Sequence, residues 1–285
     1  MKGSVNLLRT PNLNLSLVKK YMRNVFKFNP KINDPTRVLG RCFCVHNISG
    51  DKFTNTFPDT YNDNHRRSIK NPEQYWAEIA TNTVWAKPWD KVLDNSNAPF
   101  TKWFVGGKLN MCYNAVDRHV DEGIGDQKAI IWDSPITNSK RAFTYNEILD
   151  EVSALAGALV NLKVNKGDRA LIYMPMVPDA IIAMLACGRI GAIHSVVFGG
   201  FASNELASRI DDSKAKLLIT ASCGFEPGRT VEYKPLVDKA LQLASHKIEK
   251  VILFQRSGHE VKLNSPKEIS WDESLSNACL LYTSD

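Results

Sequence analysis

Short apolar runs alternate with segments of helical periodicity over residues 129–254, and this alternation limits the folds open to the chain more than any other feature. Helices are expected from about Thr144 and over 178–189, 203–212 and 235–244. Strands alternating with helices of this length form a mostly parallel sheet covered by helices on both faces. The expected fold class is therefore α/β. The expected strands are AIIW (129–132), RALIYM (169–174), AIHSVVF (192–198), KLLITA (216–221) and KVILF (250–254).

The positive charge of the chain is concentrated at its N-terminus. Seven Lys and Arg residues and no acid precede Asp34, while the whole chain of 285 residues carries a net charge of only +6. The rest is close to neutral, so its charge gives no reason to expect a nucleic-acid partner. A basic, acid-free start with apolar residues at near-helical spacing predicts a mitochondrial presequence over 1–33 and a matrix location, with a disordered basic tail as the alternative.

The remaining sequence divides into a linker, a cap and a larger domain. Residues 34–70 are polar and predict an irregular or disordered linker. The aromatic-rich segment that follows predicts a packed cap region over 71–131, and the strand–helix alternation occupies 132–278. The longest apolar run, AIIAMLACG (180–188), is far shorter than the ~20 residues of a membrane span. We therefore expect no membrane segment. The cysteines and histidines lack the spacing of metal ligands, so we also expect no metal site.

Two loops that follow expected strands have the composition of ligand-binding loops. Gly199 and Gly200 would let backbone N–H groups approach a phosphate, and the ring of Phe198 could stack on a base, although paired glycines also form ordinary tight turns. Glu226-Pro227-Gly228-Arg229 predicts a type II turn. Its exit residue, Arg229, suits bidentate phosphate recognition, and the alternative is a solvated arginine beside Glu232.

Four stretches of the chain, in order, resemble the N-terminal half of the short-chain acyl-CoA synthetases, which belong to the adenylate-forming superfamily. They are WFVGGKLNMCYNAVDRHV, GDQKAIIWDSPITNSKRAFTYNEI, YMPMVPDAIIAMLACGRIGAIHSVVFGGFA and TASCGFEPGRTVEYKPLVDKAL. The run DSPITN looks more like the propionyl-CoA synthetase branch than the acetyl-CoA one. The resemblance covers about residues 75–271, and it identifies 132–278 as an incomplete N-terminal half of the large AMP-binding domain of these enzymes.

The resemblance implies an AMP-forming acid–thiol ligase that uses ATP, Mg2+ and CoA, with propionate or acetate as substrate. It places the adenine end of CoA at Phe198, Gly199 and Gly200, and the CoA phosphates at Glu226, Pro227, Gly228 and Arg229. Glu226 stands where some relatives have a second arginine. The ATP and Mg2+ sites and every catalytic residue would lie beyond Asp285, so the chain as written is expected to be inactive. The alternatives are a truncated, non-catalytic CoA-binding or interaction protein and an acetate–CoA ligase.

The ending CLLYTSD (279–285) resembles the first residues of the phosphate loop YTSGTTG of these enzymes. In the family, however, the spacer before that loop is longer. The same seven residues can also be encoded by the transposon-end adapter of sequencing libraries. We therefore interpret 279–285 as a non-native tail and leave Thr283 and Ser284 out of the candidate site.

Overall fold

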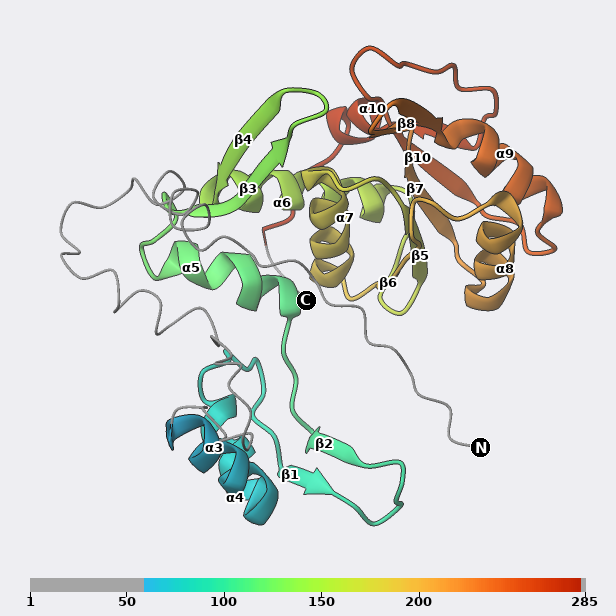
Figure 1. Ribbon diagram of the computed structural model, residues 1–285. Coiled ribbons are helices and arrows are strands. Elements are labelled where there is room, and N and C mark those ends of the chain that lie inside the picture. Colours follow the sequence, from blue (N-terminus) through green and yellow to red (C-terminus); the bar gives the residue numbers. More distant parts are fainter. Residues whose placement is uncertain (1–58, 283–285) are drawn as a thin grey trace, which may run out of the picture. The chain divides into compact units, whose positions relative to one another are not determined.

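The computed structural model describes residues 59–282 of the chain (Figure 1), so the expected presequence and most of the expected linker lie outside the described residues. The chain divides into two units, 1–66 and 67–285. Helix α3 (Asp59–Lys70) includes the boundary between them. It corrects the expectation of an irregular linker for the end of 34–70. Asp63 pairs with Arg66 at 3.3 Å, and Arg67 and Lys70 lie in the last turn, where cations stabilise a helix.

The cap region contains a packed aromatic cluster. It comprises helix α4 (Pro72–Ala80) and the antiparallel strands β1 (Lys91–Asp94) and β2 (Lys102–Val105). The rings of Trp85, Trp89 and Phe104 lie within 5.3 Å of one another, centroid to centroid. Edge-to-face and tilted contacts of this kind stabilise a small region that has few aliphatic residues. Part of the aromatic density of the sequence therefore corresponds to ring packing within the cap, whereas Phe100 and Trp103 are exposed.

A β-hairpin and a capped helix follow the cap. Strands β3 (Lys128–Ser134) and β4 (Ser139–Thr144) pair in antiparallel fashion, and helix α6 (Tyr145–Asn161) begins directly afterwards. The Glu147 backbone N–H donates to Thr144 Oγ1 at 3.2 Å, and the Thr144 N–H donates to Glu147 Oε2 at 2.7 Å. This reciprocal pair is the capping box that the sequence predicts. The partner strand β4 was not expected.

The expected parallel sheet is confirmed. Its five parallel strands lie in the order β11-β10-β7-β5-β6. The connecting helices are α7 (Pro178–Arg189), α8 (Ser203–Ser213) and α9 (Tyr233–Leu243). All five expected strands form. One of them is β3 of the hairpin and the other four lie in the parallel sheet, and each agrees with its expected bounds to within a few residues. The five strands of the parallel sheet are β5 (Arg169–Tyr173), β6 (Ile193–Val196), β7 (Leu217–Ala221), β10 (Lys250–Phe254) and β11 (Glu268–Ser270).

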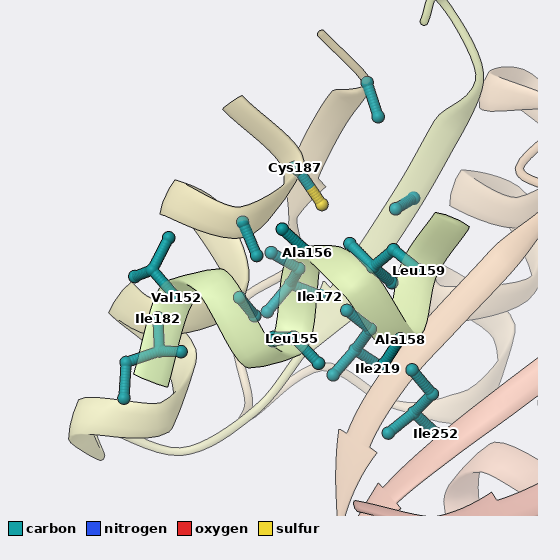
Figure 2. Close-up of a cluster of buried hydrophobic side chains, with 14 of the residues drawn as sticks. Val152, Leu155, Ala156, Ala158, Leu159, Ile172, Ile182, Cys187, Ile219 and Ile252 are labelled. Carbon is teal, nitrogen blue, oxygen red and sulfur yellow. The ribbon is translucent and has the colours of Figure 1, made fainter. Parts of the chain in front are cut away.

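Helices cover both faces of this sheet. Ile172, Ile219 and Ile252 belong to one buried cluster with residues of α6 and α7, which Figure 2 shows in close-up. The neighbouring residues Leu171 and Leu218 belong to a second cluster with residues of α8 and α9. Because successive side chains of a strand point to opposite faces, both sets must be apolar, and each strand reads as a continuous apolar run.

Shorter elements complete the fold. Strands β8 (Cys223–Glu226) and β9 (Arg229–Glu232) form a hairpin where the sequence predicts only a turn. The edge strand β11 leads into helix α10 (Trp271–Ser276). Their shortness and polar content explain why periodicity does not reveal them. Among the described residues, no helix is both long and apolar enough to cross a membrane.

A buried ion pair attaches the segment before β3 to helix α7. The π-helical turn η1 (Tyr113–Asp117) leads into helix α5 (Arg118–Asp121). Asp117 accepts two hydrogen bonds from Arg189, at 2.9 and 2.7 Å, and the Arg189 side chain is only 1% exposed. The amide of Asn110 donates to the backbone oxygens of Gly188 and Arg189 at the end of α7. Two contacts far apart in sequence thus fix the same helix end.

The last described residues lie against α6 and α7. The Leu281 N–H donates to the Ser153 oxygen at 3.1 Å, and the Tyr282 oxygen accepts from Arg189 at 2.9 Å. The Tyr282 hydroxyl also donates to Asp150 at 3.0 Å. The non-native origin of 279–285 stays a prediction, which the codons of this segment decide.

Arg189→Met should lower the free energy of unfolding by about 3–5 kcal/mol, because it leaves the Asp117 carboxylate buried without its partner. The double variant Arg189→Met/Asp117→Leu should recover much of that loss, since two apolar groups replace two charges. Denaturant unfolding of the single and double variants measures both, and Arg209→Met on the exposed face of α8 is the surface control. A double variant as unstable as the single one would contradict this account.

Candidate functional site

Both candidate loops follow strands of the parallel sheet at its carboxyl edge. Strand β5 has β6 on one side and β7 on the other, so the chain leaves β5 in one direction and later returns to pair on its other side. Ligands of open α/β sheets bind outside the carboxyl ends of the strands at such a reversal of strand order. Residues 198–200 come after β6, and residues 226–229 belong to the hairpin after β7.

The first loop presents an exposed ring on a fixed backbone. The Phe198 side chain is 71% exposed, and its ring meets Phe201 edge to face at 5.8 Å. The Tyr173 hydroxyl donates to the Phe201 oxygen at 2.7 Å and also lies 3.3 Å from the Gly199 oxygen. One face of the Phe198 ring is thus available to a planar ligand, while β5 holds the loop beneath it.

The second loop is a tight turn whose arginine is paired with a carboxylate of the same turn. Pro227 and Gly228 connect β8 to β9, and Gly228 has φ +76°, which suits the third position of the expected type II turn. The Nε of Arg229 donates to Glu226 Oε2 at 2.7 Å, and its Nη2 lies 2.6 Å from the same oxygen. The expected alternative partner, Glu232, instead lies 3.6 Å from His259.

Tyr233 lies against the first loop and against β8, the strand that leads into the second loop, and sequence reasoning did not identify it. Its ring stacks on Tyr173 at 4.9 Å between centroids. A Cβ added at Gly199 would lie 2.2 Å from the Tyr233 hydroxyl oxygen, and one added at Gly224 would lie 3.0 Å from it. Glycine is therefore required at Gly199 for space. The sequence offered a signal only for the neighbouring Tyr173, which lies inside the apolar run RALIYM, because a buried tyrosine hydroxyl needs a partner.

Burial raises the pKa of both buried tyrosines above the ordinary value. It raises the pKa of Tyr173 to about 12. Burial, and after it the negative charge of Glu226, raise the pKa of Tyr233 as well. At neutral pH the Tyr173 hydroxyl therefore keeps the proton that it donates to the loop. Across residues 59–282, no three His, Cys, Asp or Glu side chains gather as a metal site would require.

Comparison with known proteins agrees with the fold and with the resemblance of the sequence. Residues 117–284 match the sequence model of AMP-binding enzymes, and residues 61–115 match that of the acetyl-coenzyme A synthetase N-terminus. The chain belongs to the AMP-binding enzyme family.

Individual relatives agree with this assignment. "Acyl-CoA synthetase short-chain family member 3, mitochondrial" from Homo sapiens is 52% identical over 219 residues, which cover 76% of this chain and 32% of the relative. "Propionate--CoA ligase" from Escherichia coli is 42% identical over 241 residues, covering 79% and 38%. The solved "Acetoacetyl-CoA Synthetase from Streptomyces lividans" shares the fold, with a TM-score of 0.69 at 22% identity over 78% of this chain and 33% of that one. The chain spans about a third of the length of the curated relatives it matches.

Gly199→Ala should destabilise the protein by about 1–3 kcal/mol, because its methyl group collides with the Tyr233 hydroxyl. Adding Tyr233→Phe should reduce this cost, since it removes the nearest atom. The control is Gly188→Ala in α7, where the nearest heavy atom to a new Cβ is 4.0 Å away. Thermal or denaturant unfolding of the wild type, Gly199→Ala, Tyr233→Phe and the double variant gives the coupling between the two positions. Equal costs of Gly199→Ala with and without the Tyr233 hydroxyl would refute the contact.

Proposed function

We propose that this chain is the CoA-binding N-terminal part of an AMP-forming acid–thiol ligase for short-chain carboxylates. The observation that carries the proposal is that both loops follow strands at the carboxyl edge of the sheet, with Tyr233 against the first loop and against the strand that leads into the second. The family assignment and the ligase names of the relatives support it. The name of the Escherichia coli relative favours a propionate substrate, and the acyl preference is decided by comparing propionate with acetate turnover in the full-length enzyme.

Each candidate residue has a role that its environment permits. The exposed ring of Phe198 stacks on the adenine of CoA, and Gly199 and Gly200 allow the loop behind that ring to pack closely against Tyr233 and Phe198 itself. The fork of Arg229 binds a CoA phosphate, and Pro227 and Gly228 fix the turn that presents it. A CoA bound in this way would supply the thiol that accepts the acyl group. The residues named here orient CoA and carry out no chemical step themselves.

Other parts of the reaction belong to residues that we place outside this chain. Following the family resemblance, we assign ATP, Mg2+ and the acyl group to the part of the relatives that this chain does not span. We accordingly propose that the 285-residue chain binds CoA without catalysing ligation. A location in the mitochondrial matrix is supported by the basic N-terminus and by the mitochondrial names of several relatives.

Glu226 has to move before Arg229 can bind a phosphate. The two side chains form an exposed pair, with side-chain exposures of 71% for Arg229 and 43% for Glu226. Exposed pairs contribute only about 0–1 kcal/mol, so a phosphate with several acceptor oxygens can replace the carboxylate. This makes Glu226 a competitor of the ligand rather than a contact, which refines its place in the expected CoA site.

Arg229→Gln should weaken CoA binding by about tenfold or more, because a charge-assisted hydrogen bond is worth about 1.5–3 kcal/mol. Isothermal titration of the 1–285 chain with CoA measures the change. Pantetheine, which lacks the nucleotide, should bind both proteins equally. Arg209→Gln makes the same change at an exposed arginine on α8 and should leave CoA affinity unaltered. No heat with millimolar CoA from the folded wild-type chain would refute the proposed function.

Glu226→Gln should strengthen CoA binding several-fold, because it removes both the competing carboxylate and a like charge beside the phosphate. The matched control is Glu232→Gln on the same hairpin, since Glu232 lies against His259 and not against Arg229. The same titration compares the two variants. Equal tightening by both would show a general charge effect, and weaker binding of Glu226→Gln would show that Glu226 itself contacts CoA.

A further inference from the structure

A second cavity lies on the α6 and α7 side of the sheet, and the candidate CoA residues do not line it. Its volume is about 520 Å³, within the range of small-molecule sites. The β3–β4 hairpin, the start of α7 and the residues after β10 form its walls. Four aromatic side chains line it, which gives it mainly apolar walls. They are Trp132, Phe143, Phe225 and Phe254.

Arg256 is the unusual member of this cavity. The residue is only 9% exposed, and its guanidinium carbon lies 5.0 Å from the centre of the Phe225 ring. Its backbone N–H donates to Ser222 Oγ at 2.9 Å. Within residues 59–282, however, its guanidinium has no hydrogen bond and no ion pair with a carboxylate. A guanidinium that lines a cavity beside an aromatic ring and has no partner among the described residues suits an anion that comes from outside the chain.

The other charged groups of the cavity narrow the choice of anion. Arg141 stacks over Phe143 at 3.8 Å and lies 3.9 Å from Glu151, so these two opposite charges largely offset each other. Asp179 lies in the first turn of α7, and burial is the main cause that raises the pKa of its carboxyl group. The N-terminus of α7 adds positive potential, and its N-cap residue, Val177, has no side chain able to cap it.

We propose that this cavity binds a small aromatic monocarboxylate. The ligand's carboxylate lies on the fork of Arg256, and its flat apolar body lies between the rings that line the walls. A single free arginine facing Asp179 favours a ligand with one negative charge over a phosphate dianion, because the dianion would be repelled by the carboxylate. This site is independent of the proposed CoA site, because none of residues 198–200 or 226–229 lines it.

Benzoate is the probe, with benzamide as its neutral analogue and inorganic phosphate as an anion without an apolar body. We expect benzoate to bind the 1–285 chain. The two other probes should bind at least about tenfold more weakly, since benzamide lacks the negative charge and phosphate lacks the apolar ring. Titration followed by NMR of the Trp132 indole N–H, which donates to the Met176 oxygen at 3.2 Å, reports occupancy of this cavity.

Two substitutions should change benzoate affinity in opposite directions. Arg256→Gln should weaken binding by about tenfold or more, and Asp179→Asn should strengthen it, because it removes the like charge. Arg229→Gln is the control at the other site and should leave benzoate affinity unchanged. Circular dichroism and thermal unfolding establish that each variant is folded. If Arg256→Gln does not fold, Ser257→Trp at the exposed rim tests the site by blocking it.

Three results would overturn the proposal. The first is no binding of benzoate by the folded chain at millimolar concentration. The second is equal affinity for benzoate and benzamide, which would show that Arg256 does not recognise a charge. The third is unchanged benzoate affinity in folded Arg256→Gln or in Ser257→Trp. Since Arg229→Gln tests CoA and Arg256→Gln tests benzoate, failure at one site is distinguishable from failure at the other.

Discussion

Burial of the parallel sheet on both faces is the constraint on which the rest of the structure depends. Strand β7 is buried at all five of its residues, so each face must meet a helix. Helices α6 and α7 cover one face, and α8 and α9 cover the other. Parallel pairing also brings the carboxyl ends of β5, β6, β7 and β10 to one edge. The candidate binding loops lie at this edge because each of them follows a strand of the parallel sheet.

Local signals were enough for the elements that build this core. The apolar run of β5, the Pro-Asp start of α7 and the capping box of α6 are each encoded within a few residues. The interactions that join elements are not. Asp117 meets Arg189 72 positions later in the chain, and Tyr173 meets Tyr233 only because β5 and α9 pack on the same face. The Phe198–Gly200 and Glu226–Arg229 loops were identified by resemblance, whereas the tyrosines between them required the structure.

Three arginines show how surroundings decide what one residue type can do. Arg189 is buried, and both of its terminal nitrogens donate to Asp117. Its charge therefore stabilises the fold and is not available to a ligand. Arg229 is exposed and paired with its near neighbour, so exchange for a phosphate costs little. Arg256 lies over a ring at a cavity and has no carboxylate partner among the described residues, so we assign its donors to an anion from outside the chain. Burial and pairing together therefore separate the structural Arg189 from the two arginines that we propose as ligand-binding residues.

Strand β8 lies between the two proposed sites and contributes to both. Gly224 is close to the Tyr233 hydroxyl on the side of the glycine loop, while the next residue, Phe225, lies under Arg256 and lines the second cavity. This follows from the alternation of side chains along a strand. Since β8 has only four residues and ends in Glu226, residues of the two proposed sites are close neighbours along one short strand. The short hairpin after β7, which the sequence showed only as a turn, is thus the element that the two proposed sites share, although their ligands would contact different residues of it.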